Sequence, residues 1–265
     1  MDIAGPIPKN ARGRFYHLGC APGELAPYIL TCGDPDRAQT IARLLTRVDR
    51  RRKNREFLTY TGSYQDIPVS VMATGIGAPA SAIAIVEAAN CVNPVTFIRL
   101  GTCGALQADI AVGDLVITES ARRDENTTQA YAPADLVPQA APEIIAALRE
   151  AAAKLNAPYH VGITCTTADF YAGQGREAPG FPGLDPRKVA HLSQAGVLNL
   201  EMEMSAYLTL AAVSTYRVRA GGVCLVLNNR ITGQGLASGR ARRRAEGRLL
   251  DVGLQALTIL AARDQ

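Results

Sequence analysis

Several features that would place the chain in a membrane or outside the cell are missing. No run of eighteen apolar residues occurs, so the sequence offers no transmembrane helix. The segment Met1–Arg14 carries prolines and charged side chains where a secretory signal peptide needs a continuous apolar stretch. These absences exclude membrane and secreted proteins, and we expect a cytoplasmic one.

Cysteine and histidine are too scattered for a zinc site. The six cysteines include no CxxC pair, and none of the three histidines is spaced to complete a set of metal ligands. We therefore expect reduced, mostly buried thiols and no bound metal.

The chain also lacks a strong excess of charge of either sign. Its 28 basic residues are nearly matched by 24 acidic ones, which leaves a formal net charge of +4. Two basic runs, Arg47–Arg55 and Arg240–Arg248, contain no interleaved aromatic residues and are typical of solvated helix or loop faces. We expect no nucleic-acid partner, whereas a small anionic substrate is compatible with this balance.

The chain does contain apolar, β-rich runs that alternate with alanine-rich helical patterns. Its 265 residues are 48% hydrophobic, with no linker or repeat. This pattern predicts one α/β domain over residues 1–265, layered around a largely parallel sheet whose ligands bind beyond the strands' carboxyl ends. The predicted strands are Tyr28–Cys32, Val69–Ala73, Thr96–Leu100, Asp114–Thr118, His160–Thr164 and Gly222–Leu227. The predicted helices are Pro35–Leu45, Pro79–Asn90, Glu143–Leu155, Arg187–Gln194, Met204–Ser214 and Ala237–Ala262.

The first candidate loop, Gly33–Arg37, follows the first predicted strand. Asp34 can cap a helix, Pro35 suits its first turn, and Gly33 lets an anion approach the free backbone N–H groups. With the guanidinium of Arg37 beside it, the loop is a candidate phosphate site. The alternative is an ordinary capped helix with a solvated Arg37, which these residues alone slightly favour.

A second glycine-rich turn, Gly75–Ala80, formally matches the dinucleotide-binding pattern with alanine in the third place. The acidic residue expected after the next strand is missing, because Thr96–Ile98 runs into Arg99 instead. A tight turn that lets helix and sheet pack closely is therefore favoured over an NAD site.

The third predicted strand ends in Arg99–Gly104, which places a guanidinium, a hydroxyl and two glycines at one edge. Arg99 follows an apolar run, where an unpaired charge would be costly to bury. It needs an anionic partner, and the sequence leaves a protein carboxylate and a bound phosphate equally open.

Two carboxylates flank a methionine in Glu201–Glu203, after the apolar turn Val197–Leu200. They could accept hydrogen bonds from sugar hydroxyls while the Met202 thioether packs under the ring. The alternative is a pair of helix N-terminal acids, stabilised by the macrodipole.

Two further segments complete the set of candidates. The segment Thr167–Pro186, rich in glycine, proline and aromatic residues, predicts a substrate-facing loop. Arg55 precedes an alternating strand, Phe57–Tyr60, which would fix the direction of its side chain.

Together these motifs resemble those of the nucleoside phosphorylase family, and most of all its uridine-cleaving members. The resemblance runs from His17 to Arg230 and implies a single αβα domain around a central mixed sheet, assembled as a dimer-based hexamer with active sites completed across the dimer interface. It rests on His17–Gly19, Gly33–Arg37, Arg55–Phe57, Thr74–Gly77, Arg99–Gly104, Phe170–Arg176 and Glu201–Glu203.

The resemblance also implies a role for each matching residue, with Arg99, Gln174, Arg176 and Glu203 as the catalytic group. Arg55 and His17 would enter the site of the neighbouring subunit, and His17 would meet the ribose 5′-hydroxyl there. Phosphate would be bound by Gly33, Arg37, Arg55, Arg99 and Thr102. Ribose would be bound by His17, Thr102, Glu201, Met202 and Glu203. The base would be bound by Phe170, Gln174, Arg176, Leu227 and Asn228.

The implied activity is the conversion of uridine and phosphate to uracil and ribose 1-phosphate in nucleoside salvage or catabolism, with no metal or organic cofactor. Two departures bear on it: Ala80 replaces a serine of the family's potassium site, which puts that site in doubt, and Asn228 stands where an aliphatic residue usually meets the base. Leu227–Arg230 contains no acid to protonate a purine, so pyrimidine remains favoured. The alternatives are a purine nucleoside phosphorylase or nucleosidase on the same fold, an NAD(P)-dependent oxidoreductase, and a catalytically silent binding protein.

Overall fold

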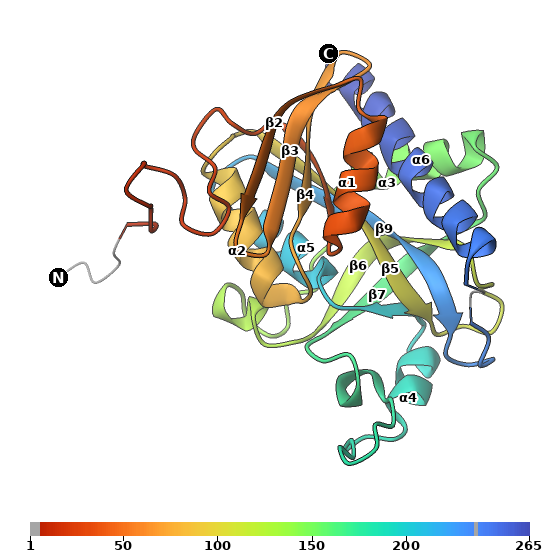
Figure 1. The fold of residues 1–265 in the computed structure, drawn as a ribbon. Helices are drawn as coiled ribbons and strands as arrows, with labels where there is room; N and C mark the ends of the chain where they lie inside the picture. The colour runs from red at the N-terminus through yellow and green to blue at the C-terminus, as the bar shows by residue number, and fades with distance from the viewer. Residues whose placement is uncertain (1–5, 236–237) are drawn as a thin grey trace.

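The computed structural model describes residues 6–235 and 238–265, in which strands and helices alternate (Figure 1). The strands are β1 (Tyr28–Cys32), β2 (Arg47–Asn54), β3 (Phe57–Tyr64), β4 (Ile67–Ala73), β5 (Val95–Ala105), β6 (Leu115–Asp124), β7 (Tyr159–Thr167), β8 (Val197–Glu201) and β9 (Val218–Asn229). The α-helices are α1 (Pro35–Leu44), α2 (Ala78–Ala89), α3 (Pro142–Lys154), α4 (Lys188–Gln194), α5 (Met204–Val213) and α6 (Arg240–Arg263). Two short 3₁₀ helices are η1 (Thr128–Ala130) and η2 (Ala172–Gln174).

The strands form a single sheet that closes on itself at one end. The order is β2-β3-β4-β1-β5-β8-β7-β6-β9, and an additional pairing of β5 with β9 closes the last five strands into a ring. Parallel pairs join β1 to β4, β1 to β5, β5 to β9, β6 to β7 and β7 to β8, whereas the other four pairs are antiparallel. Parallel pairs are thus the majority, but the antiparallel ones are too many for the expected largely parallel sheet to describe the whole, and the mixed sheet implied by the family resemblance is confirmed.

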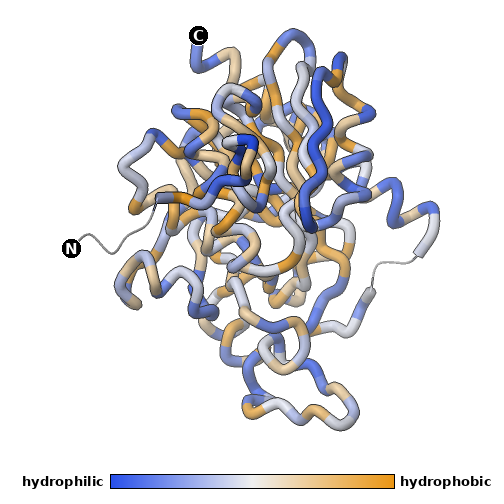
Figure 2. The backbone as a smooth tube through the Cα atoms, turned by 60° about the vertical axis from the view of Figure 1, so that its left-hand side comes forward, coloured by the Kyte–Doolittle hydropathy of each residue, from blue (hydrophilic) through white to orange (hydrophobic). Residues whose placement is uncertain are grey.

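Helices cover both faces of this sheet. On one face, α1, α3 and α6 bury apolar side chains against residues of β1, β4, β5 and β9. On the other, α2 and α5 pack on the opposite side chains of the same strands. The three-layer α/β architecture follows, with apolar stretches inside and hydrophilic ones outside (Figure 2). Period-2 alternation in β5 places Phe97 and Arg99 toward the α2/α5 layer, and Ile98 and Leu100 toward the α6 layer.

All the predicted elements are present, but two strands were missed. The basic run Arg47–Arg55, predicted as a solvated helix or loop face, contains β2, an edge strand paired only with β3 among the described residues. Its side chains are mostly exposed, so no apolar alternation marks it. The predicted turn Val197–Leu200 is the start of β8, a buried strand of five residues that is too short to show a period. Of the last predicted helix, Ala237 lies outside the described residues.

Two expectations drawn from composition can be compared with the structure. All six cysteines are buried and free of disulfide bonds, as expected for reduced interior thiols. Within residues 6–235 and 238–265, no helix is long and apolar enough to cross a lipid bilayer.

The packing of α6 on β5 generates a stability prediction. A Cβ added at Gly253 would lie 2.6 Å from both Cδ atoms of Leu100, a side chain with no exposed surface. We expect Gly253→Ala to destabilise the protein by about 1–3 kcal/mol through overpacking, although alanine is the better helix former. A Cβ added at Gly247 of the same helix has no atom within 4 Å, so Gly247→Ala should stabilise by about 0.5–1 kcal/mol. Urea unfolding of the two variants compares them, and a Gly253→Ala protein as stable as Gly247→Ala would contradict the packing argument.

Candidate active site

A cavity of about 840 Å³ opens where several strands reach their carboxyl ends. Its walls come from the segments that follow β1, β4 and β8, from the ends of β5 and β9, and from the loop around η2. The predicted site residues that line it are Gly33, Arg37, Arg99, Thr102, Phe170, Gln174, Arg176, Glu201, Met202, Glu203, Leu227 and Asn228. The structure thus brings residues from four of the recognised motifs, and Leu227 and Asn228 from the end of β9, together in one place.

One end of the cavity is formed by the turn between β1 and α1. Asp34 caps the helix, since its Oδ1 accepts the Asp36 N–H at 2.9 Å, and Pro35 occupies the first turn. A Cβ on Gly33 would lie 2.9 Å from the Gly75 carbonyl oxygen, so only glycine allows the two turns to meet this closely. Arg37 forms no ion pair with any residue in the described part of the chain. The capped helix is therefore present, and its positive N-terminal end and Arg37 both border the cavity.

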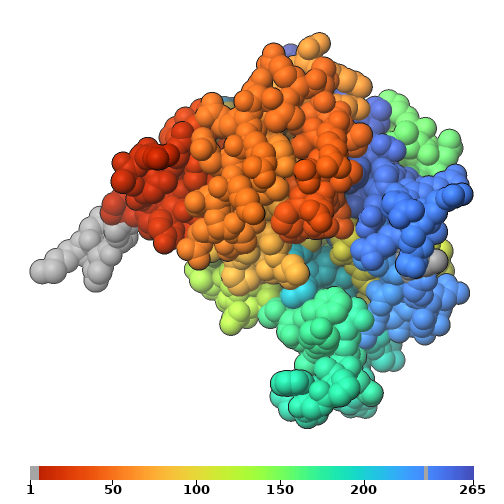
Figure 3. Space-filling model, in the orientation of Figure 1, coloured from red at the N-terminus to blue at the C-terminus, as the bar shows by residue number. Residues whose placement is uncertain are grey.

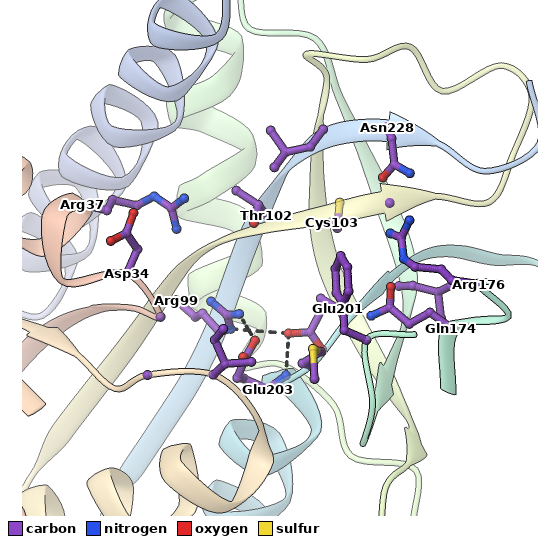
Figure 4. Close-up of a pocket in the computed structure, with 18 of the residues that line it drawn as sticks. Asp34, Arg37, Arg99, Thr102, Cys103, Gln174, Arg176, Glu201, Glu203 and Asn228 are labelled. Atoms are coloured by element: carbon purple, nitrogen blue, oxygen red, sulfur yellow. Dashed lines mark hydrogen bonds and ion pairs between the residues drawn. The ribbon is translucent and has the colours of Figure 1, made fainter. Parts of the chain in front are cut away.

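Arg99 is the buried charge at the centre of the site. Its side chain is 5% exposed and forms ion pairs with Glu203 and, at 3.4 Å from Nε to Oε2, with Glu201 (Figure 4). A Cβ on Gly101 would lie 2.7 Å from Arg99 Nη1, so the glycine leaves room for the guanidinium. Burial alone would lower the Arg99 pKa, but the two carboxylates outweigh it and raise the pKa above its ordinary value. The protein-carboxylate partner left open by the sequence is thus present.

Glu203 connects Arg99 to the glycine-rich turn before α2. Its Oε1 accepts the Gly77 N–H at 2.7 Å, while Oε2 pairs with Arg99. The positive φ angles of Gly75 and Gly77, 76° and 96°, shape this turn. Because the Gly77 N–H is bound by a carboxylate of the protein itself, the turn does not present it to a pyrophosphate.

Glu201 fixes the start of α5. Its carboxylate accepts the backbone N–H groups of Glu203 and Met204 at 2.9–3.0 Å, and the hydroxyl of Thr166 donates to it as well. Burial raises the pKa of this carboxyl, and the charge of Arg99 opposes that rise. The alternative of a helix N-terminal acid is correct for Glu201, which also supports the wall that carries Met202.

The opposite end of the cavity is built on the loop around η2. Gln174 is buried, and its Nε2 donates to Thr167 Oγ1 at 3.1 Å. The Arg176 guanidinium lies 4.3 Å from the centre of the Phe170 ring, and its Nε is buried without a partner in the described part of the chain. Burial lowers the Arg176 pKa. Figure 3 shows that the segment containing this loop and α4 projects from the body of the protein.

Sequence reasoning gave no role to Arg230, which anchors that loop. Its Nη1 and Nη2 donate to the carbonyl oxygens of Gln174 and Gly175 at 3.1 and 3.3 Å. Its only signal in the sequence was its place just after β9. Several further lining residues lie inside or next to the recognised motifs and had no predicted role in binding substrate, namely Asp34, Pro35, Gly75, Ile76, Cys103, Gly104 and Leu200.

His17 and Arg55, expected to serve a neighbouring subunit, do not line this cavity. They lie close together, since the ring of Tyr16 packs edge-on against His17 and lies under the Arg55 guanidinium at 5.7 Å. The next residue, Glu56, lies near the cavity rim, since a Cβ added at Gly75 would lie 3.9 Å from Glu56 Cγ.

Comparison with known proteins agrees with this architecture. The family model of the phosphorylase superfamily matches residues 27–257, and the chain belongs to that superfamily. The earlier resemblance is therefore confirmed, and a dinucleotide-binding oxidoreductase is the wrong class.

Within this superfamily, the chain is similar to uridine phosphorylases and to a purine nucleoside phosphorylase. A uridine phosphorylase of Thermococcus kodakarensis is 42% identical over 236 residues, which cover 88% of this chain and 83% of that protein. A solved structure from work on two uridine phosphorylases of the oomycete Phytophthora capsici superposes with a TM-score of 0.83 at 26% identity, covering 96% and 97% of the two chains. A DeoD-type purine nucleoside phosphorylase of Brevibacillus brevis is 34% identical over 92% of this chain and 98% of that protein.

The central ion pairs generate a prediction about stability. Arg99→Met leaves two buried carboxylates without their cation, so we expect the free energy of unfolding to fall by about 3 kcal/mol or more. Adding Glu203→Gln to that variant should recover part of the loss, and the double-mutant cycle should show a coupling above about 1 kcal/mol. Arg37→Met is the matched control, because Arg37 has no ion pair in the described part of the chain, and it should change stability by less than about 0.5 kcal/mol. Denaturant unfolding compares the wild type with Arg99→Met, Glu203→Gln, the double variant and Arg37→Met. Additive effects of Arg99→Met and Glu203→Gln would contradict the pairing.

Proposed function

We propose that this protein cleaves uridine with inorganic phosphate, giving uracil and ribose 1-phosphate. The observation that supports the proposal is the order of side chains across the cavity. Arg37 lies at one side and Gln174 with Arg176 at the other, and the Glu201–Glu203 wall lies between them (Figure 4). From one side to the other, these side chains suit a phosphate, a ribose and a base, in that order.

The anion end holds the attacking phosphate. Arg37 and the N-terminal end of α1 supply positive charge, and Gly33 leaves the backbone open to close approach. Arg99 is held by Glu203 on one side and directs its remaining N–H groups to the phosphate, with the Thr102 hydroxyl beside it. The Arg55 side chain of a neighbouring subunit completes this set.

The middle of the cavity holds the ribose. Met202 packs its thioether against the sugar, and the Glu203 carboxylate, already fixed by Arg99 and Gly77, accepts a sugar hydroxyl. Thr102 contacts the sugar as well as the phosphate. Glu201 acts by holding the wall in place, and His17 of the neighbouring subunit binds the 5′-hydroxyl.

The base lies at the end formed by Gln174 and Arg176. An amide offers one donor and one acceptor, which suits the N3–H and a carbonyl of uracil. The Arg176 Nε, buried without a partner in the described part of the chain, supplies a donor for the other carbonyl. Phe170, Leu227 and Asn228 close the pocket around the ring.

This arrangement performs phosphorolysis by positioning and electrostatics. The phosphate forms a bond to C1′ as the bond to the base breaks, and the sugar passes through an oxocarbenium-like state. The phosphate cluster brings the nucleophile to C1′, and Glu203 fixes the sugar. Negative charge collects on the leaving uracil, and Arg176 with the nearby Arg230 places positive charge there. Among the described residues, no acidic side chain forms an ion pair with either arginine.

One assay tests the reaction and the base preference together. We expect release of uracil from uridine to require phosphate or arsenate, because the site is built to hold an anion. Uridine should be cleaved roughly a hundredfold faster than inosine in kcat/KM, because Gln174 and Arg176 pair with a pyrimidine edge and Leu227–Arg230 offers no acid for a purine.

The outcomes separate the alternatives. Equal rates without phosphate would indicate a nucleosidase and overturn phosphorolysis. Comparable kcat/KM for uridine and inosine would overturn the pyrimidine assignment and leave the phosphorylase chemistry standing. The purine relative from Brevibacillus brevis makes this second comparison necessary.

The proposal also includes a dimer-based hexamer with shared sites. If Arg55 serves the neighbour, a mixed dimer of Arg55→Ala and Arg99→Ala chains contains one site with both lesions and one intact site. We expect each variant to be inactive alone and activity to return after subunit exchange. Native mass spectrometry confirms that exchange has occurred, and continued inactivity of the mixed dimer would contradict shared sites.

A further inference from the structure

A buried carboxylate outside the cavity holds the segment that contains His17. Glu87 lies in α2 and is 3% exposed. Its two oxygens accept the backbone N–H of His17 at 3.1 and 3.2 Å, the backbone N–H of Leu18 at 2.7 Å, and the imidazole Nδ1 of His17 at 2.7 Å. No lysine or arginine pairs with Glu87 in the described part of the chain, so its carboxylate binds only His17 and Leu18 there.

The same segment is held from its other side by the residue before Arg55. Asn54 Nδ2 donates to the carbonyl oxygens of Tyr16 and His17 at 2.8 and 2.7 Å. Arg55 follows with φ at +52°, a strained conformation for a residue with a side chain, and its guanidinium lies over Tyr16. Asn54 thus links His17 to its own chain neighbour Arg55, although His17 and Arg55 are 38 residues apart in the sequence.

The contact with Glu87 also decides which imidazole nitrogen is available. A carboxylate only accepts, so Nδ1 must carry the hydrogen, and Nε2 is left for a partner outside the segment. The His17 side chain is 28% exposed, whereas that of Glu87 is 4% exposed. A histidine oriented by a buried carboxylate, with its second nitrogen accessible, is a common way to fix both tautomer and ring direction.

We propose that Glu87 is a positioning residue that acts through His17. It fixes Nε2 as the hydrogen-bond partner of the nucleoside 5′-hydroxyl in the neighbouring site, while Asn54 keeps His17 and Arg55 in one arrangement. This inference rests on the function proposed above.

A substrate that lacks the 5′-hydroxyl isolates this interaction. We expect wild-type protein to prefer uridine to 5′-deoxyuridine by roughly tenfold in kcat/KM, the range for one hydrogen bond to a site built for it. In His17→Ala that ratio should fall to near one. Glu87→Gln keeps the size of the side chain but no longer enforces the tautomer. In this variant kcat/KM for uridine should fall at least threefold, while kcat/KM for 5′-deoxyuridine stays the same, so the ratio of the two falls at least threefold.

A matched control separates positioning from general damage. Glu24 is another buried carboxylate near the N-terminal segment, where it accepts the Ala21 N–H and pairs with Arg14 and Arg50 without contacting His17. Glu24→Gln should leave the uridine to 5′-deoxyuridine ratio at its wild-type value, even if it lowers stability. If Glu87→Gln fails to fold, Asn54→Ala gives the same test, since it removes the other support of His17 and should reduce the ratio in the same direction.

Each remaining outcome is decisive. The positioning role would be overturned if Glu87→Gln keeps the wild-type ratio of uridine to 5′-deoxyuridine cleavage while in His17→Ala that ratio falls to near one. Equal cleavage of both nucleosides by wild-type protein would overturn the inference and leave phosphorolysis intact. Failure of wild-type protein to cleave either nucleoside would overturn the proposed function and this inference with it.

Discussion

The arrangement of the site depends on one buried guanidinium, that of Arg99. A charge inside the protein requires partners, because the cost of removing it from water is several kcal/mol. Arg99 finds them in Glu201, the last residue of β8, and in Glu203, just after that strand. Glu203 in turn accepts the Gly77 N–H before α2. One charge therefore joins β5, the β8–α5 turn and the β4–α2 turn.

The sheet explains why these turns meet. β5 pairs with β9 along one edge; along its other edge it pairs with β1 near its start and with β8 at its end. It therefore belongs both to the open part of the sheet and to the closed ring. The cavity forms where these strands end, and the carboxyl ends of parallel strands deliver the loops that the chemistry needs. The η2 loop follows β7, whose last residues pair with the end of β8, and Arg230, just after β9, binds two carbonyl oxygens of this loop.

Local signals in the sequence predicted the parts of the molecule that depend on local chemistry. The cap at Asp34, the first-turn Pro35 and the turn at Gly75–Gly77 are where the pattern placed them. β2 and β8 were missed because one carries exposed charges along an edge and the other has five residues. The positions of Arg230 and Glu87 could not be predicted, since their partners are about 55 and 70 residues away and only the fold brings them together.

The Arg99 ion pairs show a related limit. The sequence required an anionic partner for a charge inside an apolar strand, and it could not choose between a protein carboxylate and a phosphate. A carboxylate pair does not exclude the phosphate, because a guanidinium has five N–H donors and Glu203 uses only part of them. In the proposed function, Arg99 binds both partners at the same time.

The basic edge strand β2 has a consequence for how copies of this protein can meet. An edge strand presents free backbone N–H and C=O groups that can template the addition of another strand. In β2 those groups are flanked by Arg47, Arg50, Arg51, Arg52 and Lys53. If two copies met along this edge, their basic side chains would face each other. The resulting electrostatic repulsion disfavours pairing of the two β2 strands into a continuous intermolecular sheet.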